Sequence, residues 1–226
     1  MTRHPLDRPA WSALTSRQHS FALGGPLAMR YAVDVAPFAA ARDDDDECLA
    51  ALAALVSAGE SVLLLQAGDS PAPPGLATET TAKGVQMVAP TLRPSGGDCR
   101  IEPLSEADAA EMRALALLTK PGPFLARTHR LGDFIGVREN GRLVAMAGER
   151  MKLDGFAEVS GVCTHPDFRG RGYAGALSYA VAARIAARGE TPFLHAYASN
   201  EGAIRLYESL GFVLRSEVTV TKFVRA

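Results

Sequence analysis

Hydrophobic residues in the second half of the chain follow a helical period in one segment. Leu177, Val181 and Ile185 fall four residues apart, with alanines between them. Residues at this spacing share one face of a helix, so the pattern predicts a helix over 172–188 that packs closely on a sheet. Gly189 directly after this segment is a typical helix end.

Other segments show the patterns of strands. Val218 and Val220 alternate with threonines inside 212–224, as in an antiparallel strand with two different faces. Apolar runs at 133–138 and 142–151 flank an Asn-Gly pair, which is a strong hairpin signal.

The complete pattern after residue 98 predicts a strand, a helix, three strands, a helix, a strand, a helix and a strand. These elements are expected at 99–103, 105–118, 133–138, 142–151, 156–164, 172–188, 192–198, 201–210 and 212–224. We therefore expect an α/β (α+β) domain over 99–226, with a mixed, mostly antiparallel sheet flanked by helices. About 125 residues is an ordinary size for one domain.

Residues 1–98 form a second, smaller α/β region by the same criteria. The expected elements are a helix over 9–22, a strand over 27–35, a helix over 48–57, strands over 61–66 and 84–89, and a Pro/Gly-bearing linker over 90–98. The acidic run 43–47 precedes the second helix. We interpret it as a helix start, which suits the helix dipole, in preference to a metal site or a basic-partner site.

Composition narrows the class of protein. The 226 residues are 47% hydrophobic and 22% charged, with a formal net charge of −1, so the chain can bury a core and lacks the basic excess of a nucleic-acid or anionic-membrane binder. Cys48, Cys99 and Cys163 lack metal-ligand spacing, so no metal is expected. No signal core and no run of about 18 apolar residues occurs, which predicts a cytoplasmic protein.

A glycine-rich loop joins the strand ending near residue 164 to the helix starting at Gly172. Gly170 and Gly172 allow positive φ and close backbone approach, while Arg169 and Arg171 reach phosphate oxygens. The first amides of the helix add an anion site. An ordinary tight turn is the alternative interpretation. The spacing fits neither a Walker loop nor a Rossmann fingerprint.

A second segment strengthens the phosphate interpretation. Asn200 precedes the next predicted helix, Ala203 and Tyr207 lie on it, and a Gly-Phe pair follows at 211–212. Together with the spelling Arg169-x-x-Gly172-x-Ala174, this segment resembles the GNAT superfamily of acyl-CoA-dependent N-acetyltransferases. The resemblance covers 100–226, and residues 1–98 are then a candidate degenerate GNAT-like half.

The resemblance implies acetyl-CoA as co-substrate and assigns residues to it. The pyrophosphate would lie on Arg169, Gly170, Arg171, Gly172, Tyr173 and Ala174. The pantetheine arm would pair with the backbone of Val162, Cys163 and Thr164 and with the Asn200 side chain, which also suits a helix cap. Tyr207 would protonate the leaving thiolate, the alternative being a core aromatic.

Acyl transfer to an amine needs a base to remove the ammonium proton. Glu158 and Glu149 lie on neighbouring predicted strands, and a pair of carboxylates would raise one pKa toward neutrality. The alternatives are exposure to solvent or ion pairs with Arg150 or Arg142. Cys163 is disfavoured as a nucleophile because the sequence places no histidine to activate it, and His165 and His195 are expected to be structural.

The resemblance implies an N-acetyltransferase that transfers an acetyl group to a small-molecule or peptide amine by direct attack in a ternary complex. The alternative is a non-catalytic acyl-CoA-binding regulatory module. We expect no nucleic-acid or membrane partner, and dimer formation through the first half stays open.

Overall fold

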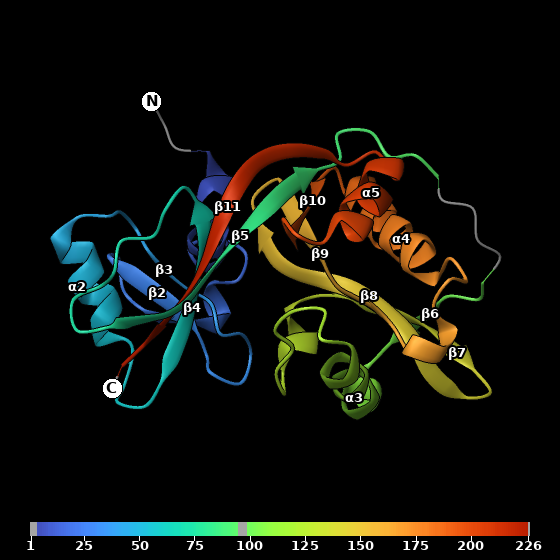
Figure 1. The fold of residues 1–226 in the computed structure, drawn as a ribbon, viewed down its shortest axis with the longest axis horizontal. Helices are drawn as coiled ribbons and strands as arrows, with labels where there is room; N and C mark the ends of the chain where they lie inside the picture. Colours follow the sequence, from blue (N-terminus) through green and yellow to red (C-terminus); the bar gives the residue numbers. More distant parts are fainter. Residues whose placement is uncertain (1–3, 95–98, 226) are drawn as a thin grey trace.

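The computed structural model describes residues 4–94 and 99–225, and it confirms the mixed α/β fold (Figure 1). The helices are α1 (Pro9–Leu14), α2 (Asp46–Ala54), α3 (Ala109–Thr119), α4 (Tyr173–Ala187) and α5 (Glu201–Ser209). The strands are β1 (Ala22–Gly24), β2 (Ala28–Tyr31), β3 (Ala39–Ala41), β4 (Ser61–Ala67), β5 (Ala77–Val88), β6 (Glu102–Leu104), β7 (Phe134–Glu139), β8 (Arg142–Leu153), β9 (Phe156–Thr164), β10 (Thr191–Tyr197) and β11 (Val213–Val224).

One eight-stranded sheet runs through both halves of the chain. Its order is β4-β11-β5-β10-β9-β8-β7-β6, and β1, β2 and β3 form a separate three-stranded sheet. The last strand, β11, lies between two strands of the first half and pairs antiparallel with both. The division expected near residue 98 therefore separates two regions that differ in composition but share one sheet. Residues 95–98 of the expected linker lie outside the described part.

The sheet separates at its centre. Strands β9 and β10 are parallel neighbours, but their pairing covers only Thr191–Phe193 against Phe156–Glu158. Beyond that point β9 continues to Thr164 and β10 to Tyr197 without pairing with each other. Backbone groups on the facing edges of the two strands are left available to a ligand.

Helices cover both faces of the β7–β9 part of the sheet. Ala145 and Ala147 on β8 pack in one cluster with Leu177 and Val181 of α4. Met146 between them packs with α3 in another cluster. Successive strand residues point to opposite faces, so α4 and α3 lie on opposite sides, as Figure 1 shows.

Local signals mark the starts of three helices. Asp45 caps α2 by accepting a hydrogen bond from the Cys48 amide, which confirms that the acidic run starts a helix. Asn200 caps α5 through the Ala203 amide. Gly172 takes a left-handed φ of 80° immediately before α4.

Several expected elements of the first half are wrong in extent. The helix predicted over 9–22 ends at Leu14, and β1 begins at Ala22. The strand predicted over 27–35 covers only Ala28–Tyr31, and the helix predicted over 48–57 covers Asp46–Ala54. The strand predicted over 84–89 begins at Ala77, because the largely exposed polar segment 77–83 is held by pairing with β11 and has no apolar pattern of its own. Within the described ranges, no helix is long and apolar enough to cross a membrane.

Candidate active site

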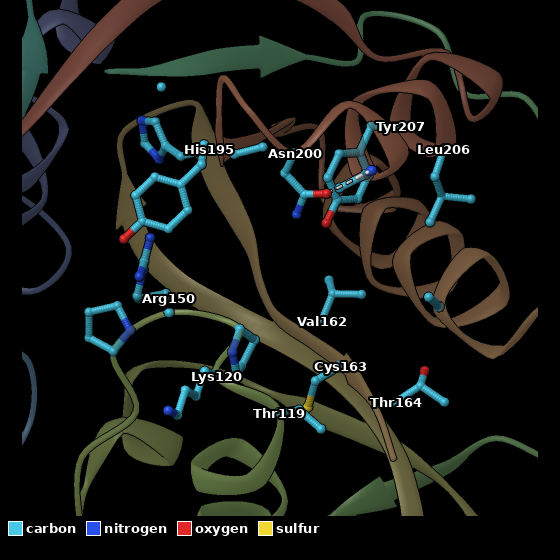
Figure 2. Close-up of a pocket in the computed structure, with 18 of the residues that line it drawn as sticks. Thr119, Lys120, Arg150, Val162, Cys163, Thr164, His195, Asn200, Leu206 and Tyr207 are labelled. Atoms are coloured by element: carbon cyan, nitrogen blue, oxygen red, sulfur yellow. Dashed lines mark hydrogen bonds between the residues drawn. The ribbon is translucent and has the colours of Figure 1, made fainter. Parts of the chain in front are cut away.

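A cavity of about 540 Å³ opens where β9 and β10 separate (Figure 2). It brings together every residue that the sequence predicted to hold a coenzyme: Val162, Cys163, Thr164, Arg169, Gly170, Arg171, Gly172, Tyr173, Ala174, Asn200 and Tyr207. These residues come from β9, the following loop, α4 and α5. Their coenzyme-binding role stays a prediction, and their common cavity is the geometry that such a role needs.

The glycine-rich loop has the backbone shape of an anion site. Gly170 and Gly172 take φ values of 78° and 80°, and a Cβ at either position would meet nothing within 4 Å. Backbone conformation, and not crowding, is therefore the reason for glycine here. No side chain caps α4, so its first amides are open to a ligand.

The two loop arginines are held differently. Arg171 stacks its guanidinium over the Phe168 ring, 4.8 Å from the ring centroid. Arg169 donates from Nε to the Thr164 carbonyl at 3.4 Å. Both side chains line the cavity, so positive charge concentrates at the α4 end of a protein with almost no net charge.

Tyr207 reaches the cavity from α5, and its side chain is almost fully buried. Burial raises its pKa to about 12, so the phenol is a proton donor at neutral pH. Within the described residues no hydrogen bond holds this hydroxyl. In Figure 2, Tyr207 and Asn200 lie on one side of the cavity and Arg150 on the other, with Val162 and Cys163 below Tyr207 in this view.

Cys163 behaves as a structural residue. Its side chain is buried, and burial raises the pKa of its thiol to about 11. A neutral thiol is a poor nucleophile, which argues against a nucleophilic role for Cys163.

Glu158 does not line the cavity among the described residues. It is fully buried and accepts hydrogen bonds from Arg150 Nε at 2.9 Å and Nη2 at 2.6 Å, with His195 Nδ1 at 2.7 Å. Burial alone would raise its pKa, but Arg150 and His195 outweigh burial and hold the pKa well below the ordinary carboxyl value. The expected upward pKa shift is therefore wrong for Glu158, and the Arg150 ion pair that the sequence left as an alternative is present.

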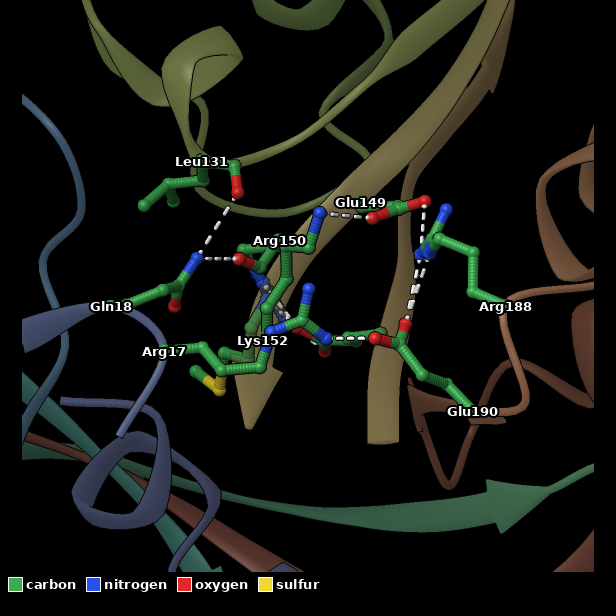
Figure 3. Close-up of polar contacts among 10 residues, drawn as sticks. Arg17, Gln18, Leu131, Glu149, Arg150, Lys152, Arg188 and Glu190 are labelled. Atoms are coloured by element: carbon green, nitrogen blue, oxygen red, sulfur yellow. Dashed lines mark hydrogen bonds and ion pairs between the residues drawn. The ribbon is translucent and has the colours of Figure 1, made fainter. Parts of the chain in front are cut away.

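Glu149 lies on the opposite face of the sheet from Glu158. Its carboxylate pairs with Lys152 at 2.8 Å and with Arg188 at 2.9 Å, and Arg188 also pairs with Glu190 (Figure 3). The two carboxylates therefore hold separate cationic partners and do not form the pair that the sequence suggested.

Several residues of the cavity were not identified from sequence. Lys120 was assigned only to a helix-breaking segment, and His195 was considered structural; both line the cavity with Arg150. The first half contributes Phe38, Leu63, Leu65 and Gly84 to the same wall. No local signal marks these positions, because long-range strand order brings them to the site. Gln18 of the first half also donates to the Arg150 carbonyl at 2.6 Å (Figure 3).

Comparison with known proteins agrees with this arrangement. Residues 134–222 match the model of the FR47-like protein family. The chain is 46% identical to a crystallised member of the GNAT family from Novosphingobium aromaticivorans, with a TM-score of 0.93 over 99% of this chain and 100% of that one.

More distant structures share the fold. A GCN5-related N-acetyltransferase from Kribbella flavida is 19% identical, with a TM-score of 0.66 over 98% of this chain and 96% of that one. A GCN5-related N-acetyltransferase-like protein from Streptococcus suis is 14% identical, with a TM-score of 0.62 over 97% of this chain and 96% of that one. No curated protein sequence matches the chain.

Proposed function

This chain belongs to the GNAT family of acyltransferases, and from that premise we propose that it transfers an acetyl group from acetyl-CoA to a primary amine. One observation carries the proposal: a single cavity contains the separated edge of β9, the uncapped start of α4 and the hydroxyl end of Tyr207. A thioester coenzyme needs these three features together, namely partners for its amides, its phosphates and its leaving sulfur.

In the proposed complex the pyrophosphate of the coenzyme accepts hydrogen bonds from the first amides of α4 and from Arg169 and Arg171. The pantetheine arm pairs with β9 as an added strand would, through backbone groups that β10 leaves unpaired. The Asn200 side chain keeps its Nδ2 available to the arm, because its Oδ1 accepts from the Ala203 amide at 3.2 Å.

The reaction forms a C–N bond to the amine and breaks the thioester C–S bond. Tyr207 donates its proton to the thiolate and is reprotonated from solvent. Among the described residues that line the cavity there is no carboxylate. We therefore propose that water accepts the ammonium proton, so that kcat/KM rises with pH until the free amine predominates.

Release of CoA thiol from acetyl-CoA, measured over a panel of amines, tests this proposal. Tyr207→Phe is expected to lower kcat about 100-fold or more while leaving acetyl-CoA affinity within a few-fold, in line with the loss of a general acid. Tyr179→Phe is the matched control, because it removes a hydroxyl from α4 outside the cavity. A protein that binds acetyl-CoA and releases no thiol with any amine would instead be a binding module.

A further inference from the structure

The half of the cavity away from α4 has a different lining from the rest, and we call this surface the acceptor wall. It consists of five apolar residues, Phe38, Leu63, Leu65, Val218 and Val220, together with Lys120 and Arg150. Figure 2 shows Arg150 and Lys120 on the side of Val162 opposite Tyr207 and Leu206. This wall is the surface that an acyl acceptor would meet.

Arg150 presents one fixed edge of its guanidinium to the cavity. Its Nε and Nη2 are engaged by Glu158, and its guanidinium carbon lies 4.7 Å from the centroid of the Phe38 ring. Nη1 has no hydrogen-bond partner within the described residues, and it lies 4.0 Å from the position that a Cβ on Gly122 would take. The side chain is thus held on one edge and on one face, and both N–H groups of Nη1 are left without a partner in the described part of the chain.

Lys120 supplies a second positive charge at the same wall. It ends α3 in a left-handed conformation with φ of 52°, and its amide donates to the Ala116 carbonyl at 2.8 Å. Glycine is the usual residue at such a helix end. The following Pro121-Gly122-Pro123 segment also lines the cavity, and proline restricts its backbone.

The charged side chains of this wall leave a positive excess. Glu158 offsets Arg150, and His195 is held between Glu158 and Gln86 through its two ring nitrogens. Gln86 Oε1 accepts from Arg215 and Gln86 Nε2 donates to the Leu6 carbonyl. His195 Nε2, 2.9 Å from Gln86 Nε2, must then accept, which leaves Nδ1–H to donate to Glu158. Lys120 remains uncompensated among the lining residues.

We propose that the acceptor is a primary amine carrying a carboxylate beside its nitrogen and an apolar side chain, that is, an apolar α-amino acid. This inference rests on the proposed function. A simple ammonium ion or a polyamine would meet two cations and no carboxylate here. The carboxylate of an amino acid binds Arg150 Nη1 and Lys120 Nζ, and its side chain packs on Phe38, Leu65 and Val218. The products are an N-acetyl amino acid and CoA thiol.

Matched pairs of amines that differ only in the carboxylate give the sharpest test. Thiol release is measured with leucine against isopentylamine and with phenylalanine against phenethylamine. Each kcat/KM is corrected for the fraction of that amine that is unprotonated at the assay pH. The proposal expects kcat/KM at least about 10-fold higher for each amino acid, from one charge-assisted contact. Spermidine is expected to be the poorest acceptor.

Lys120→Gln then tests the wall itself. It is expected to lower the ratio of kcat/KM for leucine to kcat/KM for isopentylamine about 10-fold. Lys222→Gln is the control, because Lys222 pairs with Glu79 on β5, outside the cavity.

Each outcome decides between the two proposals. Equal or better turnover of isopentylamine, phenethylamine or spermidine would overturn the anionic acceptor and leave acetyl transfer standing. Preference for the phosphonate analogue of leucine would also overturn it, by assigning the wall to a phosphate group. If the protein does not bind acetyl-CoA, or releases no thiol with any of the amines, the proposed function is wrong.

Discussion

Glu158→Gln separates a structural ion pair from a catalytic base. The carboxylate is 0% exposed and accepts from Arg150, from His195 and from the Met151 amide at 3.2 Å. Glutamine keeps the shape but removes the charge and turns one acceptor into a donor. At least one of the three partner groups then faces another donor, and the Arg150 charge stays buried without compensation.

The magnitude follows from this geometry. Breaking a buried ion pair by neutralising one partner costs about 3–5 kcal/mol of unfolding free energy. In a chain of this size each kcal/mol moves the melting temperature by about 2–4 °C, so we expect a fall of about 6–20 °C. The double variant Glu158→Gln/Arg150→Met removes both charges and should recover part of this loss.

The assay is calorimetric melting at pH 7, with Glu106→Gln as the matched control. Glu106 also binds an arginine in bidentate fashion, Arg130 at 2.9 and 3.0 Å, and a histidine, His129, at 3.0 Å. Its side chain is 62% exposed, so Glu106→Gln removes an ion pair that water already screens. This substitution should change the melting temperature much less than Glu158→Gln does.

The pH dependence has a definite sign. Because the folded pKa of Glu158 is depressed, its contribution is fully present above the ordinary carboxyl pKa of 4.5 and is lost as pH falls through the lower folded value. The melting-temperature difference between wild type and Glu158→Gln should therefore shrink below about pH 4.5. A variant that melts like wild type but loses kcat and the rising limb of its pH profile would refute this reasoning and identify Glu158 as the base.

Three further predictions address the rest of the site. Arg171→Ala should weaken CoA binding about 10-fold, less so in high salt, by titration calorimetry; an equal loss in Arg184→Ala, on the exposed surface of α4, would contradict a specific phosphate contact. Gly172→Ala should lower stability by about 1–2 kcal/mol, measured by denaturant unfolding, because its φ is 80°; an unchanged midpoint would show that the loop rearranges. Cys163→Ala should retain acyl transfer, and mass spectrometry of wild type mixed with acetyl-CoA should show no acyl-protein; an acylated Cys163 would disprove direct attack.

The sequence by itself determined the parts of the site that depend on neighbouring residues. The loop from Arg169 to Ala174 and the cap at Asn200 follow from glycine φ values and from the unpaired amides at helix starts. The alternation of Val218 and Val220 fixed a strand in the same way. These features need only a few residues on either side, so they were predicted in the right place.

Only the tertiary structure decided what meets these parts across the sheet. The register of the β8–β9 pairing, in which Glu149 lies opposite Val159, brings Arg150 against Glu158 and leaves Glu149 on the other face. The insertion of β11 between β4 and β5 brings Leu65 and Val218 to the acceptor wall. A one-residue change of register turns every side chain to the opposite face, and strand order joins residues far apart in the chain. Both are set by packing of the whole sheet, which a local pattern does not contain.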